Sequence, residues 1–169
     1  MPAADRPVNS RWDTSSTGTN VRRSDFDITN TVRVSSPQAV LLAVEQLTAS
    51  TWPHIDMQPV RRAFADFEQL FAGRMPGYAG VDTIYHDRQH TLDVTLAMSR
   101  LVAGYERQVE PMWKLGPERA MAGMVMALFH DVGYLRRDSD TAQANGAEFT
   151  RTHVSRGIEF QAGYLPQVG

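Results

Sequence analysis

Residues 85–94, with the sequence YHDRQHTLDV, concentrate titratable side chains. They contain two of the five histidines of the 169-residue chain, at His86 and His90, together with two aspartates. If this segment is helical, His86, His90 and Asp93 lie on one face, because positions three and four apart are neighbours on a helix. Imidazole and carboxylate groups on a shared face can bind a metal ion or transfer protons. A solvated helix surface is the alternative interpretation.

A second pair, His130 and Asp131, follows the most hydrophobic segment of the chain. Residues 120–129 are apolar on every side of a helix, which is typical of a helix surrounded by other helices. A carboxylate at the buried end of such a helix is costly unless it is paired or neutralised. Two remedies are available: arginines such as Arg136 and Arg137, or a divalent cation shared with other ligands.

Together, the two segments resemble the HD superfamily of metal-dependent phosphohydrolases. YHDRQHTLDVT is similar to the YHNxxHxxDV element of cyclic-nucleotide phosphodiesterases, and ALFHDVGY is similar to the HD signature. The resemblance covers about residues 80–160 and implies that His90, His130 and Asp131 are metal ligands. It also implies that His86 protonates the leaving oxygen when metal-activated water hydrolyses a nucleotide-like phosphoester.

The cofactor implied by the resemblance is one or two divalent metal ions. A shell of histidine and aspartate suits Mn, Mg, Zn, Fe or Ni, and the ligand types do not choose among them. The expected partner is a small-molecule phosphoester, a nucleotide by resemblance. Two other interpretations stay open: a catalytically silent HD module that binds a nucleotide or a partner, and an HD-type di-iron oxygenase.

Four further residues are candidates for the site. His153, in THVSRGIEF, resembles an HxxxG element that supplies an extra histidine ligand in a bacterial branch of the family; a surface or capped histidine is the alternative. Asn145 and Glu148, in NGAEF, are similar to polar positions that follow the HD pair and support its ligands. Asp93 is a candidate acceptor for the N–H of a ligating imidazole, or else a solvated or ion-paired helix residue.

The family pattern also includes a further aspartate on a later helix, and this chain has none after His153. Two explanations compete: the 169 residues are the front part of a longer protein, or the natural site is incomplete. We favour the first. Helices that lack their normal cover would expose apolar surface, which favours association between chains, such as a homodimer.

Composition excludes several classes of protein. Because the chain has no cysteine, disulfides, cysteine-ligated zinc and thiol nucleophiles are excluded. A net charge of −2 and a pI near 6.2 provide no basic surface for nucleic acid or an acidic membrane. No secretory signal is present and no apolar run reaches the roughly 18 residues that span a bilayer. We therefore expect a cytoplasmic protein without a membrane partner.

The elements that would position the candidate residues are helical, because no segment shows the alternation of a strand. We predict an all-α fold, an HD-domain-like helical bundle of about five helices. Ser36 and Pro37 begin the first helix, which ends near Ser50. The second starts between residues 54 and 59 and ends at Gly73. The remaining helices are predicted at about residues 83–107, 117–129 and 145–162.

Domain organisation follows from the same pass along the chain. Residues 1–35 are polar and lack periodicity, so they are predicted to form a flexible leader. Residues 36–169 are predicted to form one HD-type helical domain. Trp12, Phe26 and Ile28 are the leader residues that could dock on it. In the second helix, an apolar stripe with helical spacing predicts the core residues Val60, Phe64, Phe67, Leu70 and Phe71.

Overall fold

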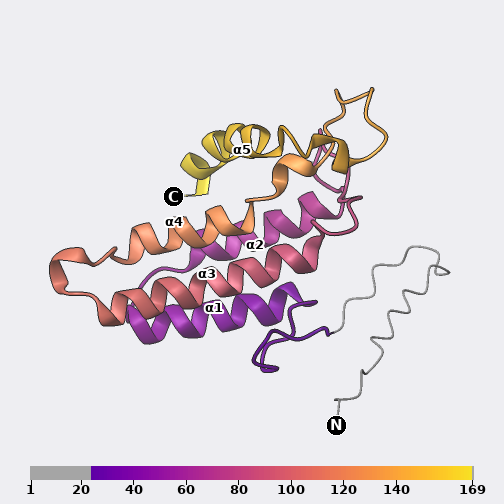
Figure 1. The fold of residues 1–169 in the computed structure, drawn as a ribbon. Coiled ribbons are helices and arrows are strands. Elements are labelled where there is room, and N and C mark those ends of the chain that lie inside the picture. The colour runs from indigo at the N-terminus through magenta and orange to yellow at the C-terminus, as the bar shows by residue number, and fades with distance from the viewer. Residues whose placement is uncertain (1–23, 169) are drawn as a thin grey trace, which may run out of the picture.

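The predicted all-α bundle is confirmed. A computed structural model describes residues 24–168, and within that range it contains five α-helices and no β-strand (Figure 1). The helices are α1 Pro37–Thr51, α2 Gln58–Phe71, α3 Arg88–Gln108, α4 Pro117–Leu128 and α5 His153–Val168. Short 3₁₀ turns lie between them: η1 Pro111–Trp113, η2 Val132–Tyr134 and η3 Gly146–Phe149. No helix of this range is long and apolar enough to cross a bilayer.

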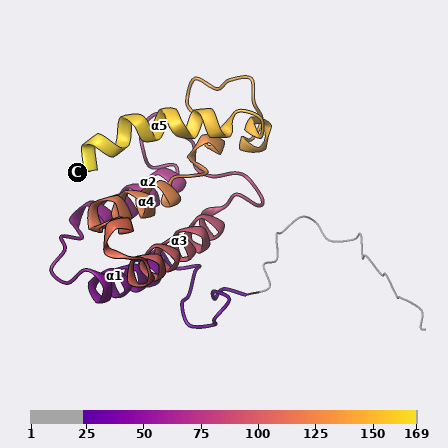
Figure 2. The same cartoon turned by 60° about the vertical axis from the view of Figure 1, so that its left-hand side comes forward.

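The helices are arranged in layers. Figures 1 and 2 show α5 lying over the side of the bundle formed by α2 and α4, with α1 and α3 beyond them. The predicted core stripe of α2 is confirmed, since Val60, Phe64, Phe67, Leu70 and Phe71 are all buried. Phe67 meets Phe129, just past α4, edge to face with ring centroids 6.4 Å apart. This contact ties α2 to the chain segment that carries the HD pair.

Local capping decides where the helices begin. The hydroxyl of Ser36 accepts a hydrogen bond from the Ala39 N–H at 3.2 Å, as predicted for the start of α1. The carboxylate of Asp87 accepts from the His90 N–H at 2.7 Å and caps α3. The predicted helix start at Thr83 is therefore wrong by about one turn. Consequently His86 precedes α3 and does not share a helix face with His90.

The last helix also begins later than predicted. Asn145 caps only the short turn η3, through a hydrogen bond from the Ala147 N–H at 3.0 Å. The chain then turns again, and α5 begins at His153. The helix predicted from Asn145 is thus two elements, and His153 stands in the first turn of the second one.

The hydrophobic helix α4 is not surrounded on all sides. Met124, Val125 and Leu128 are buried, whereas Met126 is 50% exposed. Helix α4 packs on α3 and α2, and α5 leaves one of its faces open. The prediction of a fully enclosed helix is wrong for this face, which becomes the wall of a pocket described below.

Part of the predicted leader is docked on the bundle. Asp27 is 7% exposed and receives a salt bridge from Arg100 of α3 at 2.8 Å. Val34 is fully buried. Residues 24–35, which fall within the leader predicted for residues 1–35, thus contribute buried side chains to the bundle, whereas Ile28 points into solvent. Trp12 lies outside the described residues.

Candidate metal centre

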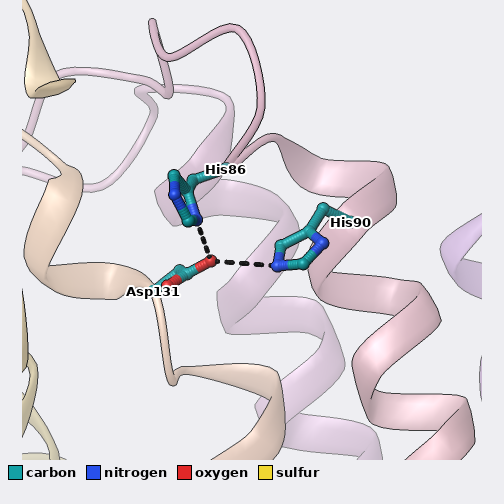
Figure 3. A group of neighbouring side chains, drawn as sticks. All are labelled: His86, His90 and Asp131. Atoms are coloured by element: carbon teal, nitrogen blue, oxygen red, sulfur yellow. Dashed lines mark hydrogen bonds and ion pairs between the residues drawn. The ribbon is translucent and has the colours of Figure 1, made fainter. Parts of the chain in front are cut away.

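Three histidines converge on one buried carboxylate oxygen. The Oδ2 atom of Asp131 lies 2.8 Å from His86 Nδ1, 3.0 Å from His130 Nε2 and 3.4 Å from His90 Nε2. The Asp131 side chain is only 4% exposed, while each histidine is partly open to solvent. Figure 3 shows His86 and His90 approaching the carboxylate from two directions. The two sequence segments singled out above thus meet at one point.

The local chain path explains this convergence. Helix α4 ends at Leu128, so His130 and Asp131 stand in the turn that leads into η2. His90 lies in the first turn of α3, and α3 packs along α4. His86 reaches the same carboxylate from the segment before α3, where its carbonyl accepts a hydrogen bond from the Thr83 hydroxyl at 2.7 Å.

The orientation of the His130 ring favours a positive charge between it and Asp131. Its Nδ1–H donates to the Ala127 carbonyl at 2.8 Å. Nε2 therefore faces Asp131 Oδ2, 3.0 Å away, with either a second proton or a lone pair. Two lone pairs at that distance repel, so the contact is favourable only with a proton or a metal cation between the atoms. Backbone anchoring of the distal ring nitrogen is also the usual support of a ligating histidine.

The protonation of the pair follows from the same contacts. Burial alone would raise the pKa of Asp131, but the hydrogen bonds from His130, His90 and His86 outweigh it and hold that pKa far below its ordinary value. For His130, burial alone would lower the pKa. The contacts with Asp131 and the Ala127 carbonyl outweigh it, so the pKa is raised. Asp131 is therefore an anion, and it is the charge that any cation at this point would meet.

The donor set fits a divalent cation. His86, His90 and Asp131 each offer a ligand atom, and these atoms all lie within 4.8 Å of one another. Two donors about 2.1 Å from one ion are about 3.0 Å apart at a right angle and about 3.4 Å apart at the tetrahedral angle. The distances from Asp131 Oδ2 to His130 Nε2 (3.0 Å) and to His90 Nε2 (3.4 Å) fall in this range, whereas His86 Nδ1, at 2.8 Å, lies slightly closer. His130 contacts the same oxygen and completes the set of candidate ligands.

Arginine is not the partner of Asp131 in the described structure. Arg136 Nε lies 3.0 Å from Asp82, and Arg137 Nη2 lies 2.7 Å from Glu159. Both side chains named in the sequence-based alternative are thus engaged elsewhere. Asp82 also accepts a hydrogen bond from the Gly146 N–H at 2.7 Å, so it joins the loops on both sides of the site.

His153 lies beside the cluster, with its ring centroid 6.3 Å from that of His86. The Tyr134 ring stacks on His86 at 4.2 Å and on His153 at 4.3 Å between centroids, with an interplanar angle of 17° in each case. His153 Nδ1–H donates to the Thr150 carbonyl at 2.8 Å, as His130 does to its own preceding turn. The structure therefore brings His153 close to the site but outside the group of three that could share an ion.

Gly133 allows α5 to approach so closely. A Cβ atom on Gly133 would lie 1.9 Å from the His153 carbonyl oxygen, a separation that no side chain can adopt. Gly157 is buried one turn after His153, and a Cβ there would lie 3.4 Å from the His130 carbonyl oxygen, which is an ordinary van der Waals contact. The close approach of His153 to the turn that carries His130 and Asp131 therefore depends on Gly133.

The remaining candidates lie apart from the carboxylate or have no described contact with it. Asn145 and Glu148 are exposed and serve the η3 turn, Asn145 as its cap and Glu148 by accepting from the Ala144 N–H at 2.8 Å. Asp93 is half-buried in α3, three residues after His90. Supporting roles for these three stay predictions.

Sequence reasoning missed Tyr134. The only signal was an aromatic residue three positions after Asp131. Its stacking between His86 and His153 depends on the tight η2 turn, which periodicity does not reveal.

No protein-family model, curated protein or solved structure matches this chain. Its own residues and the resemblance of its two motifs are therefore the basis for a functional proposal.

Proposed function

We propose that the chain is a metal-dependent phosphohydrolase of the HD type, acting on a nucleotide-like phosphoester. The observation that supports this best is the convergence of three imidazoles on the buried Asp131. Three imidazole nitrogens surround one buried carboxylate oxygen, and no arginine of the described residues lies beside it. It is the arrangement expected of a cation site.

The residues that would hold the ion are His90, His130 and Asp131, and a ligand role for His153 stays a prediction. A bound divalent cation would supply Lewis-acid stabilisation of phosphoryl charge and would lower the pKa of water. Asp131 contributes the negative charge of the site. The backbone carbonyl of Ala127 keeps the lone pair of His130 Nε2 directed inward.

In the proposed reaction His86 delivers the proton. The oxygen of water forms a bond to phosphorus as one of its protons passes to solvent, and the ester P–O bond breaks. The leaving oxygen takes the Nε2 proton of the His86 imidazolium to become an alcohol, and solvent restores the proton to His86. Nδ1 of His86 bonds to Asp131, so Nε2 is the nitrogen free to turn toward the substrate. Stacking on Tyr134 fixes the plane of the ring, which is a requirement for directed proton transfer.

The test is metal-dependent product release by the purified chain. The protein is loaded in turn with Mn, Zn, Fe(II), Ni or Mg, and cyclic and linear nucleotides are screened for ring opening or phosphate release. His86→Gln should retain metal and lose turnover by about 10²- to 10⁴-fold, the range for a general acid. His54→Asn is the matched control, because His54 is exposed with φ +73°, a conformation that asparagine accepts.

Three results would contradict the proposal. Equal loss of metal in His86→Gln would show that His86 is a ligand and not the proton donor. Bound metal with no hydrolysis of any nucleotide would favour the silent binding module, and oxygen-dependent turnover with iron would favour the oxygenase.

A further inference from the structure

We infer that a pocket next to the metal centre binds the organic group of the substrate, and that this group is neutral, largely apolar and of aromatic size. The inference rests on the proposed function and specifies its substrate class. The pocket has a volume of about 500 Å³ and lies between α3, α4 and α5. Its lining is Val94, Met98, Gly123, Met126, Ala127, His130, Asp131, His153, Val154, Gly157, Ile158 and Gln161.

The walls of the pocket are apolar and open. Met126, Val154 and Ile158 are large hydrophobic residues with exposed fractions of 50%, 60% and 64%, and all three line this one hollow. Val94 and Met98 of α3 complete the opposite wall. Exposed apolar side chains gathered in a concavity mark a binding surface more strongly than scattered ones do. The volume lies within the range of about 300–1,000 Å³ typical of small-molecule sites.

The polar end of the pocket is the metal centre. His130, Asp131 and His153 belong to the same lining as the apolar residues. A phosphoester held at Asp131 would therefore extend its organic group along the apolar walls. No lysine or arginine is among the lining residues, and Asp131 is their only carboxylate. A charged organic group would find no partner, so a neutral one is favoured.

The Oε1 atom of Gln161, in the pocket wall, indicates that the bound organic group carries a hydrogen-bond donor. Gln161 Nε2–H donates to the Phe129 carbonyl at 3.2 Å, while its Oε1 is buried without a partner in the described structure. A buried acceptor without a donor is rare and unfavourable. An O–H or N–H on the bound organic group would satisfy it, after a small movement of the amide.

A small-molecule phosphoester would contact more of the pocket lining than an apolar side chain from a second protein would. Such a side chain would cover Met126 and Ile158 but would leave the imidazoles and the carboxylate at the inner end without a ligand. A phosphoester engages both ends. The two occupants also differ in their consequences for oligomeric state, which the experiment below uses.

The first measurement is binding of 1-naphthol to the metal-free protein, followed by naphthol fluorescence. The probe is neutral, aromatic and carries one O–H, and it requires no hydrolysis. Gly123→Phe fills the pocket from α4, where nothing lies within 4 Å of a Cβ atom. Gly104→Phe is the matched control: Gly104 is also a helical glycine with nothing within 4 Å, on α3 and outside the pocket lining.

We expect saturable naphthol binding by the wild type and by Gly104→Phe, and binding at least about tenfold weaker by Gly123→Phe, since one buried ring contact is lost. Met126→Glu should weaken it as well, whereas Met112→Glu, at a 79% exposed position outside the lining, should not. The inference is overturned if the wild type does not bind naphthol saturably or if Gly123→Phe binds as well as Gly104→Phe. It is also overturned if sedimentation shows a wild-type dimer that Gly123→Phe dissociates.

The second measurement separates this inference from the proposed hydrolysis. With metal-loaded protein, Gly123→Phe should raise KM for 1-naphthyl phosphate at least about tenfold more than it raises KM for methyl phosphate, whereas Gly104→Phe should change neither. Naphthol binding without phosphate release from either ester would support the pocket and contradict the hydrolase. Equal effects on both esters would overturn the pocket.

Discussion

Replacing Asp131 by asparagine tests the metal centre most directly. The Asp131→Asn substitution keeps the size of the side chain but removes the only anion among the proposed ligands. The oxygen that lies 2.8–3.4 Å from three histidine nitrogens would become a neutral amide atom or an N–H donor. The substitution therefore removes the negative charge and leaves a weaker metal ligand, while it preserves the packing of the buried turn.

The expected change in Tm can be calculated from the linkage between metal binding and unfolding. Changing a residue that only supports a ligand weakens metal binding about 10- to 100-fold, so losing the charged ligand should weaken it by at least about 100-fold. At a metal concentration of about 100 times the wild-type Kd, the ion stabilises the wild type by about 2.7 kcal/mol. The variant would then be half-saturated and stabilised by about 0.4 kcal/mol. At about 2–4 °C per kcal/mol, the metal-induced rise in Tm falls from about 5–11 °C to about 1–2 °C.

The assay is thermal unfolding with and without Mn, Zn, Ni, Fe(II) or Mg, followed by circular dichroism. Asp138→Asn is the control, because Asp138 is an exposed carboxylate seven positions away and changes the net charge equally. It should keep the full metal-induced rise in Tm. A wild type whose Tm none of the five metals raises would refute the reasoning, and so would an Asp131→Asn variant with the full rise.

Three further predictions concern the framework of the site, each checked by urea unfolding. Gly133→Ala should destabilise the fold by about 1–3 kcal/mol or more, because its Cβ would lie 1.9 Å from the His153 carbonyl oxygen; Gly163→Ala, with open space at its Cβ, should be nearly neutral. Arg156→Ala should cost about 2–4 kcal/mol, because this guanidinium donates to Asp140 at 2.6 Å and to the carbonyls of residues 133 and 135; an unchanged stability would contradict its role in holding α5. Burial alone would raise the pKa of Asp27, but hydrogen bonds from neighbouring hydroxyl, backbone and guanidinium groups lower it overall. Its stabilisation is therefore present above the ordinary pKa of about 3.9 and is lost as the pH falls below it. The difference in stability between the wild type and Asp27→Asn should shrink between pH 7 and pH 3, and a difference independent of pH would contradict the assignment.

Periodicity predicted the helices and their buried stripes because it depends on local side-chain spacing. Val40, Val44 and the aromatics of α2 are buried as their positions indicate. Helix starts were predicted less well, since they depend on which of several capping residues the chain uses. Asp87 caps α3 although Thr83 precedes it in the sequence, and Asn145 caps a 3₁₀ turn instead of a helix.

The residues of the candidate site were predicted better than their arrangement in space. The pairing of the two histidine segments with Asp131 was implied by the resemblance to the HD superfamily, since the cost of burying that carboxylate left an arginine partner and a cation both open. His86 and His90 were grouped because they were expected to share a helix face. That reason is wrong, since α3 begins after His86, although both rings reach Asp131. Tertiary packing of the turn after α4 brings them together, and so does the stack on Tyr134; neither has a local sequence signal.

His86 lies outside α3 and His90 within it, so these two histidines belong to different kinds of structure, a loop and a helix. His90 lies in the first turn of the capped helix α3. His86 belongs to the preceding loop, in which Asp82 forms a salt bridge with Arg136 and accepts a hydrogen bond from the Gly146 N–H. Backbone hydrogen bonds also join this loop to the loop that carries Arg136, from the Ala79 N–H to the Arg136 carbonyl at 2.8 Å and from the Asp138 N–H to the Gly77 carbonyl at 3.0 Å. In the proposed function, retention of an ion would thus depend on a capped helix and on the turn after α4, and delivery of a proton on a braced loop.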